Sequence, residues 1–415
     1  MQQLPMLYDV FFDYLCLQIF IKMLNNLYLR NVKLSGYKSI QSVDVEFQDG
    51  LNIVIGKNAA GKTNFLNFLN KTLKFDFRGL NNFNSILEFQ NGKKISIESK
   101  GAMDKKDFFL NNDFNSNFES KLKIGRKVIK IEDHFSDLAE RDILYNSTFI
   151  CHGIPKNLPI IDSPLQFIVK KDETSDDLLN MYRNENLPYF IKNIILKLIF
   201  INFSFDKITE SKIEKVIEKE FENLSFFSDM LRKYSPISEI RVSDNFNVFI
   251  SDNKKEFTLN NFFIEFKIEN QWLPFSSLSD GTKRLFYIIS EIYDDSDFYK
   301  FGITFSTYIT TEKEKLSRII LLEEPELGIH PHQFHKLMNF LKVQSETKQI
   351  ILTTHSPQAL DFLESNELNR IVLAYSENSS NTKLRHLDEK ELSKAKLYIE
   401  NNFLSDYWLH SNLEN

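Results

Sequence analysis

The sequence has few cysteines and no excess of positive charge, and both absences exclude classes of protein. Its only two cysteines, Cys16 and Cys151, have neither the spacing of a metal site nor the number needed for a disulfide framework. This fits a reducing cytoplasm, where disulfides are rare. The net charge of −6 argues against wholesale electrostatic binding to nucleic acid, although a local basic patch could still bind it.

The sequence also lacks a convincing membrane segment. Residues 1–22 are mildly apolar but contain two aspartates, and they lack the basic start and cleavage site of a signal peptide. Residues 187–203 are nearly continuous in apolar side chains, but two lysines and an asparagine interrupt them. We therefore expect an accessory helix at the start of the chain, a buried or interface helix at 187–203, and no membrane partner.

A glycine-rich motif lies between a predicted strand and a predicted helix. Residues 51–55 are apolar enough for a buried strand, and residues 65–73 place apolar side chains at helical spacing. The segment between them matches G-x-x-x-x-G-K-[ST], a loop whose backbone N–H groups bind polyphosphate. The nucleotide-binding residues predicted from it are Gly56, Lys57, Asn58, Ala59, Ala60, Gly61, Lys62, Thr63 and Asn64.

Each end of this motif has a predicted chemical role. The helix that begins near Gly61 directs its positive dipole end at the β-phosphate. Lys62 can place a compact charge against the β- and γ-phosphates, and the hydroxyl of Thr63 can ligate Mg²⁺. ATP and Mg²⁺ are therefore the expected cofactors.

Two further apolar strand patterns end in residues that can act on a bound nucleotide. The run at 319–322 ends in Glu323 and Glu324, and adjacent carboxylates are costly there unless they meet a cation or transfer a proton. Glu323 can hold Mg²⁺ through water, and Glu324 can deprotonate the attacking water. The run at 349–352 is followed by His355, which can contact the γ-phosphate from the same sheet edge.

The segment Leu-Ser-Asp-Gly at 278–281 opens another predicted helix. Taken alone, it is an ordinary start, in which Ser279 or Asp280 caps the helix before the apolar residues that follow. Its meaning comes from the motifs on either side. Strands that alternate with helices imply a largely parallel core sheet in an α/β fold.

The basic segment at 121–130, KLKIGRKVIK, has two interpretations. A strand pair with one solvated basic face is favoured by the acidic balance of the chain. A contact to DNA is the alternative. Residues 330–335 contain three histidines, but no fourth ligand is evident for a zinc site.

The order of these motifs resembles the ABC-type ATPase heads of the RecF, SMC and OLD-nuclease group. GKNAAGKTN resembles their Walker A motif, LSDGTKRL their signature motif, LLEEPELGIHP their Walker B motif and TTHSP their switch-histidine segment. The resemblance covers about residues 24–75 and 270–375. It implies a P-loop head with a mostly parallel core sheet, an N-terminal antiparallel β subdomain, and a mixed helical insertion between the Walker A and signature motifs.

The resemblance also implies a mechanism. Two heads would dimerise head to tail and enclose two ATP molecules, with Glu324 and His355 as catalytic residues and with Thr63 and Glu323 as ligands of Mg²⁺. The signature residues would act from the other subunit; they are Ser279, Asp280, Gly281 and Lys283. ATP binding would close the dimer, and hydrolysis would open it.

The sequence departs from the family pattern at a few positions. Glu323 replaces a more usual Asp, which could weaken hydrolysis, and Asp280 replaces the Gly of transporter signatures. The glutamine loop could contain either Gln90 or Gln166. SMC-type heptad arms are not expected in residues 174–234, and residues 376–415 are too few for an OLD-type nuclease domain.

The predicted organisation has four parts. An N-terminal extension (1–23) precedes a first head segment (24–100), an insertion (101–269) and a second head segment (270–415). The leading hypothesis is a cytoplasmic, ATP-hydrolysing homodimer or higher even oligomer that controls a protein effector, a nuclease or toxin. Similar ATPases accompany such effectors in antiphage systems such as Septu and PARIS. The alternatives are an ATP-locked scaffold and a RecF-like repair ATPase that binds DNA.

Overall fold

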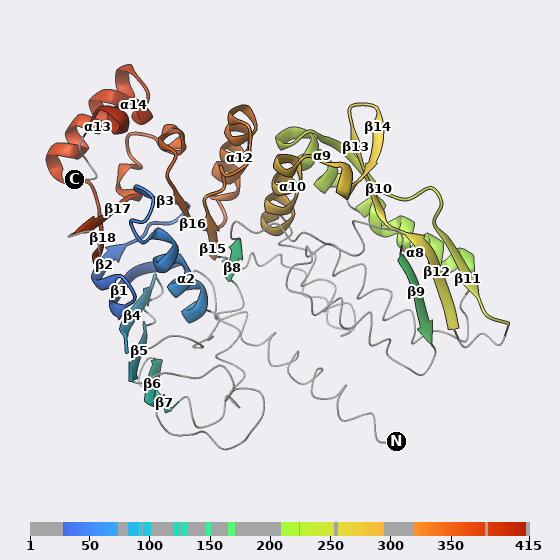
Figure 1. Ribbon diagram of the computed structural model, residues 1–415, viewed down its shortest axis with the longest axis horizontal. Helices are drawn as coiled ribbons and strands as arrows, with labels where there is room; N and C mark the ends of the chain where they lie inside the picture. The colour runs from blue at the N-terminus through green and yellow to red at the C-terminus, as the bar shows by residue number, and fades with distance from the viewer. Residues whose placement is uncertain are drawn as a thin grey trace. The chain divides into compact units, whose positions relative to one another are not determined.

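The computed structural model describes residues 28–73, 82–90, 92, 94–100, 119–124, 127–130, 147–150, 165–170, 209–223, 225–252, 256–293, 319–377 and 381–411. The predicted helices at 1–22 and 187–203 lie outside these residues. The chain divides into two compact units (Figure 1). Unit 1 contains Met1–His152, Glu312–Glu326 and Leu341–Asn415, and unit 2 contains Gly153–Thr311 and Leu327–Phe340.

A six-stranded, mostly parallel sheet forms the centre of unit 1. Its order is β18-β17-β3-β16-β15-β8, and only β18 runs antiparallel to its neighbour. β3, β15 and β16 are buried at every position, as expected for parallel strands that are covered on both faces. The bounds are Leu51–Ile55 (β3), Ser147–Ile150 (β8), Ile319–Glu323 (β15), Gln349–Thr354 (β16), Ile371–Glu377 (β17) and Asn381–Arg385 (β18).

An antiparallel sheet forms a second layer of unit 1, in the order β2-β1-β4-β5-β6-β7. β4 pairs with β5 as an antiparallel hairpin, and the basic segment at 121–130 forms the strand pair β6 and β7. The bounds are Leu29–Tyr37 (β1), Ile40–Glu46 (β2), Asn84–Phe89 (β4), Lys94–Lys100 (β5), Glu119–Ile124 (β6) and Lys127–Lys130 (β7).

Helix α2 (Lys62–Leu73) packs with both sheets of unit 1. Its buried side chains belong to one hydrophobic cluster with strands of the antiparallel sheet and with strands of the parallel sheet. These side chains are too many for a single helical stripe, which is typical of a helix that is covered on more than one side. They are Phe65, Leu66, Phe68, Leu69 and Leu73. The P-loop helix is therefore fixed at its start by the core of the unit.

A buried glutamine ties the two sheets of unit 1 together. The side-chain oxygen of Gln349, at the start of β16, accepts a hydrogen bond from the Leu29 N–H of β1 at 2.8 Å. Its amide nitrogen donates to the Leu29 carbonyl at 2.7 Å and to the Gln48 carbonyl at 2.9 Å. Gln349 is fully buried, so water cannot replace these bonds.

Replacing Gln349 with leucine is expected to lower the free energy of unfolding of unit 1 by about 2 kcal/mol or more, because the N–H and the carbonyl of Leu29 lose a buried side-chain partner. The Gln48 carbonyl keeps the hydrogen bond that it accepts from Asn52. Urea unfolding followed by circular dichroism measures the change. The matched control is Gln41→Leu on the exposed side of β2, which we expect to alter stability by less than about 0.5 kcal/mol. Equal changes in the free energy of unfolding for the two substitutions would contradict the proposal that Gln349 connects the two sheets.

Unit 2 contains two three-stranded antiparallel sheets and several helices. One sheet has the order β10-β13-β14, and the other has the order β11-β12-β9. The strands are Leu165–Lys170 (β9), Ile237–Val242 (β10), Asn247–Ile250 (β11), Glu256–Phe262 (β12), Ile264–Ile268 (β13) and Gln271–Pro274 (β14). The helices are Glu210–Asn223 (α8), Ser225–Tyr234 (α9), the short η3 (Phe275–Ser277) and Asp280–Tyr293 (α10); α12 (Pro331–Gln344) begins in unit 2 and ends in unit 1.

The remaining elements of unit 1 follow β16. Two short 3-10 helices, η4 (Pro357–Phe362) and η5 (Leu368–Arg370), precede β17, and α13 (Glu389–Asn401) and α14 (Leu404–His410) follow β18. The Asp361 carboxylate of η4 accepts hydrogen bonds from the backbone and the hydroxyl of Ser405 in α14, both at 2.8 Å. Within the described residues, no helix has the length and hydropathy needed to cross a membrane.

The predicted α/β architecture is confirmed, with a mostly parallel core sheet, an N-terminal antiparallel subdomain, and a mixture of helices and strands in between. The place of β8 in the core sheet was not predicted. β8 lies within the predicted insertion, yet it pairs with β15 at the edge of the core sheet. The predicted domain boundaries at 23, 100 and 269 remain a prediction.

Candidate functional site: a nucleotide-binding edge of the parallel sheet

The P-loop folds around the side chain of its own lysine. Lys62, the first residue of α2, is only 4% exposed. Its ammonium group donates to the Gly56 carbonyl at 2.6 Å and to the Lys57 carbonyl at 2.9 Å. The charge is therefore held over the loop that connects β3 to α2, with Thr63 exposed beside it.

Two glycines of the loop are required by packing against β17 and β18. A Cβ atom on Gly56 would lie 2.0 Å from the Ala374 carbonyl oxygen, and one on Gly61 would lie 1.9 Å from the Thr382 hydroxyl. Gly61 also has a φ of +88°, which L side chains rarely adopt. The glycines thus let the loop lie directly on the neighbouring strands, a reason that sequence alone did not indicate.

Asn64 is bound to the turn between β1 and β2. Its amide donates to the Ser39 hydroxyl at 2.9 Å, and its carbonyl oxygen accepts from Lys38 Nζ at 3.3 Å. Ser39 in turn lies 2.7 Å from the Thr382 hydroxyl. The β1–β2 turn therefore supports the start of α2, and Lys38 stands beside the predicted nucleotide loop.

Glu323 lies on the face of the core sheet that α2 covers. Its register partner on β16 is Thr353, which pairs in turn with Val54 on β3. Side chains at the same level of neighbouring strands lie on the same face of a sheet. Val54 belongs to the cluster that contains the α2 side chains. Glu323, which is 3% exposed, therefore lies on the face of the sheet that α2 covers, and Thr63 is the second residue of that helix.

Glu324 and His355 meet just beyond the ends of β15 and β16. Glu324 has a φ of +39°, which is uncommon for a residue with a side chain, and its N–H donates to the Thr353 carbonyl at 2.8 Å. Glu324 Oε1 lies 3.8 Å from His355 Nδ1. Strained backbone of this kind is often found at functional sites. The structure thus brings together the two predicted catalytic residues.

A third carboxylate, which the sequence did not single out, lies closer to the histidine. Glu326 Oε1 is 3.3 Å from His355 Nδ1 and accepts hydrogen bonds from the His355 N–H at 3.1 Å and the Thr354 hydroxyl at 2.5 Å. The sequence could have indicated a role for Glu326 only through its position, as a third acidic residue two positions after Glu324.

The predicted signature residues lie in unit 2 at the start of α10. The Ser279 hydroxyl accepts a hydrogen bond from the Thr282 N–H at 3.2 Å, so Ser279 caps the helix. A Cβ atom on Gly281 would approach the Gly328 carbonyl oxygen at 2.9 Å. Phe266 and Phe286, whose ring centroids are 4.9 Å apart, hold α10 against β13.

The other predicted residues of this segment point to solvent or to local partners. Asp280 is 93% exposed, and Lys283 Nζ donates to the Ser276 carbonyl at 3.1 Å.

Of the two glutamine-loop candidates, Gln90 is exposed in the turn after β4, and Gln166 is in β9 of unit 2. These positions do not decide which of the two glutamines belongs to a glutamine loop.

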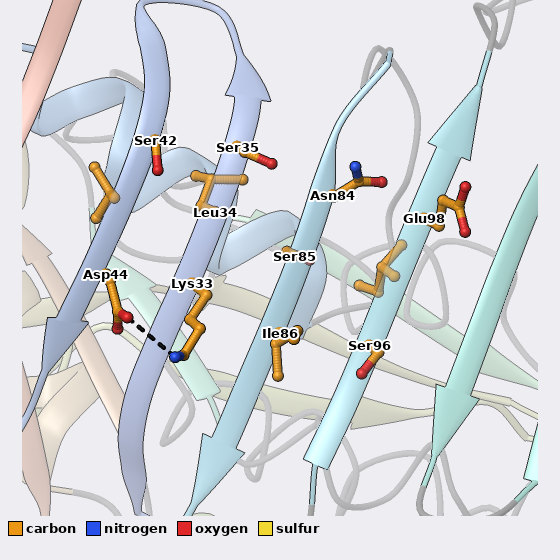
Figure 2. Close-up of a pocket in the computed structure, with 12 residues that line it drawn as sticks. Lys33, Leu34, Ser35, Ser42, Asp44, Asn84, Ser85, Ile86, Ser96 and Glu98 are labelled. Atoms are coloured by element: carbon orange, nitrogen blue, oxygen red, sulfur yellow. Dashed lines mark ion pairs between the residues drawn. The ribbon is translucent and has the colours of Figure 1, made fainter.

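A shallow depression of about 640 Å³ lies on the antiparallel sheet and not at the nucleotide loop. Figure 2 shows Lys33 and Asp44 reaching toward each other across β1 and β2, and their ion pair measures 3.0 Å. Ser42, Ser96 and Glu98 also line it. Its lining contains no residue of the nucleotide motifs, so the chemistry of the sheet edge locates the candidate site better than this depression does.

The residues at the sheet edge fit a nucleotide and a divalent cation. The donor set combines a lysine ammonium, a hydroxyl at a helix start and a buried carboxylate, which suits phosphate with Mg²⁺. The Thr353 hydroxyl, level with Glu323, is buried and has no hydrogen-bond partner among the described residues. A buried polar atom of this kind usually has a partner, such as ordered water or an ion.

Together the fold and the site define an α/β head of the ABC-type P-loop class. The chain belongs to the family described as "AAA domain, putative AbiEii toxin, Type IV TA system", whose model matches residues 154–361. The matched region contains the predicted signature segment at 278–281, Glu323, Glu324 and His355. The P-loop lies outside the matched region, and the identification of Lys62 therefore depends on its own motif and geometry.

Three bacterial proteins are similar in sequence to this chain. The chain is 22% identical over 358 residues to Septu protein PtuA of Bacillus thuringiensis, which covers 82% of this chain and 75% of that protein. It is 24% identical over 365 residues to endonuclease GajA of Bacillus cereus (strain VD045), covering 82% of this chain and 57% of that protein. An ATP/GTP phosphatase of Helicobacter pylori (strain ATCC 700392 / 26695) is 21% identical over 367 residues, with coverage of 81% and 87%.

Solved structures of SMC heads are also similar. An Smc head domain with an extended coiled coil, bound to the C-terminal domain of ScpA and derived from Pyrococcus furiosus, has a TM-score of 0.46 at 14% identity. That match covers 90% of this chain and all of that one. The SMC head domain from Thermotoga maritima has a TM-score of 0.41 at 12% identity, with coverage of 87% and 100%.

Proposed function

We propose that this protein is an ATP-hydrolysing switch that dimerises head to tail and controls a partner protein. The observation that carries this proposal is the meeting of the P-loop, Glu323, Glu324 and His355 at one edge of the parallel sheet within unit 1. Open α/β sheets bind their ligands at the carboxyl ends of the strands. The AAA-family match supports nucleotide binding.

Each residue at this edge has a proposed part in the reaction. Lys62 and the first N–H groups of α2 would bind the phosphates. Thr63 and Glu323 would hold Mg²⁺, which would neutralise charge on the phosphate oxygens. Glu324 orients the attacking water and accepts its proton. His355 contacts the γ-phosphate, which is released as inorganic phosphate. The similarity to an ATP/GTP phosphatase supports hydrolysis rather than binding alone.

The second half of each site is proposed to come from another copy of the chain. Ser279 and Gly281 stand at the exposed start of α10, where backbone N–H groups are available to an anion. A head-to-tail dimer would place this helix start on the nucleotide of the partner. ATP would then favour the closed dimer because it contacts both subunits only in that state.

The proposed setting is cytoplasmic antiphage defence, with a nuclease or toxin as the controlled effector. The similarity to Septu protein PtuA and to endonuclease GajA supports this setting. The chain spans 57% of the length of GajA, so the activity of that whole protein is not transferred to this chain.

Mixing two inactive variants tests the composite site. Lys62→Met disables the P-loop side, and Ser279→Arg disables the signature side. Each variant alone is expected to have no turnover, whereas a 1:1 mixture should recover about a quarter of the wild-type rate per chain. Half of the dimers are then mixed, and each mixed dimer contains one complete site. A phosphate-release assay measures the rates, and light scattering with Mg-ATP measures the dimer.

A second mixture provides the control. Lys62→Met and Glu324→Gln disable the same side of the site, so mixing them should restore nothing. Recovery in the control mixture, or no recovery in the first, would contradict the head-to-tail arrangement. Assembly of the wild type with ATP but without turnover would instead favour the ATP-locked scaffold.

A further inference from the structure

One carboxylate oxygen of Glu326 contacts both Thr354 and His355. Oε1 accepts hydrogen bonds from the hydroxyl of Thr354, the last residue of β16, and from the N–H of His355, at 2.5 Å and 3.1 Å. The same oxygen lies 3.3 Å from His355 Nδ1. The side chain of Glu326 is only 10% exposed, whereas the side chain of His355 is 42% exposed.

The position of this carboxylate determines which nitrogen of the imidazole faces outward. Glu326 is nearer to Nδ1 than Glu324 is, at 3.3 Å against 3.8 Å. A carboxylate beside one ring nitrogen keeps a proton on that nitrogen and fixes the plane of the ring. Nε2 is then the ring atom left to face a ligand, as His355 is 42% exposed.

The second oxygen of Glu326 has an unusual environment. Oε2 is buried and has no hydrogen-bond partner in the part of the chain that the structure describes. A half-satisfied buried carboxylate costs free energy, and such groups are typically retained where they have a function. Structural support of the turn alone would not require a charged group at this position.

We infer that Glu326 is a positioning residue that acts on turnover through His355, by holding its ring with the proton on Nδ1. This inference depends on the proposed function for its kinetic consequence, but not for the state of the ring. It assigns a task to the third carboxylate of the Glu-Glu-Pro-Glu segment that neither proton transfer by Glu324 nor metal binding by Glu323 accounts for.

A double-mutant cycle tests the kinetic consequence. Glu326→Ala is expected to lower kcat about 10- to 100-fold while changing KM for ATP about threefold or less. In a His355→Ala background the same substitution should have no further effect, because the residue through which it acts is gone. Additive losses would overturn the inference. Glu364→Ala, an exposed carboxylate in the loop after η4, is the matched control.

The conservative variant separates positioning from support of the fold. Glu326→Gln keeps an oxygen for Thr354 and for the His355 N–H but removes the charge beside Nδ1. We expect its melting temperature to match the wild type and its kcat to stay at least about fivefold lower. A wild-type kcat in Glu326→Gln would show that support of the backbone is sufficient, and would overturn the inference.

Nitrogen-15 NMR of histidine-labelled protein tests the inference without any turnover. The His355 signals, assigned by their loss in His355→Ala, should show the proton on Nδ1 in the wild type and a changed pattern in Glu326→Ala. Identical patterns in both proteins would overturn the inference. If the wild type does not hydrolyse ATP, the proposed function fails, while this measurement still decides the role of Glu326.

Discussion

Glu324→Gln is expected to reduce ATP turnover by about 10²- to 10⁴-fold while ATP binding is retained. Glutamine has nearly the same size as glutamate, and the backbone of residue 324 is held by its own N–H bond to Thr353. The substitution therefore removes the proton acceptor without moving the ends of the strands. The loss should appear in kcat, because the carboxylate acts on the reacting water and not on the nucleotide.

The same variant should accumulate in the ATP-bound dimer. Hydrolysis is the step that would release the closed state, and without it Mg-ATP is expected to hold the dimer during size-exclusion chromatography with light scattering. The matched control is Glu346→Gln, an exposed carboxylate in the turn after α12, whose turnover should stay within about twofold of the wild type. Unchanged turnover in Glu324→Gln would remove Glu324 from the mechanism.

Lys62→Met is expected to weaken ATP binding by about 100-fold or more, which is about 2.7 kcal/mol. Two effects combine in this loss. The phosphates lose a buried cation that pairs with them, and the carbonyls of Gly56 and Lys57 lose the donor that holds the loop closed. Fluorescence of a labelled ATP analogue, titrated with protein, measures the dissociation constant.

The control for this prediction is a lysine outside the site. Lys33, whose side chain is half exposed on the outer face of the antiparallel sheet, pairs only weakly with Asp44 in solvent. Lys33→Met should leave the dissociation constant within about twofold. If Lys62→Met bound ATP as tightly as the wild type, the P-loop assignment would be wrong.

Much of the candidate site could be predicted because its motifs are local. The run at 51–55, the loop at 56–63 and the helix from 62 are consecutive, and their apolar spacing and glycines determine a strand, a loop and a helix. The same holds for Glu323 at the end of β15 and for Ser279 before α10.

The sequence by itself determined these elements and the chemistry at their ends, because both depend on residues close together along the chain. Only the tertiary structure decided that β16 lies between β3 and β15, that β8 joins their sheet, and that Glu326 reaches His355. Pairing of residues about 300 positions apart depends on burying apolar faces that many strands share, so no local pattern specifies the partner. The sheet order therefore brings the predicted residues together, and it also supplies the carboxylate that the pattern did not reveal.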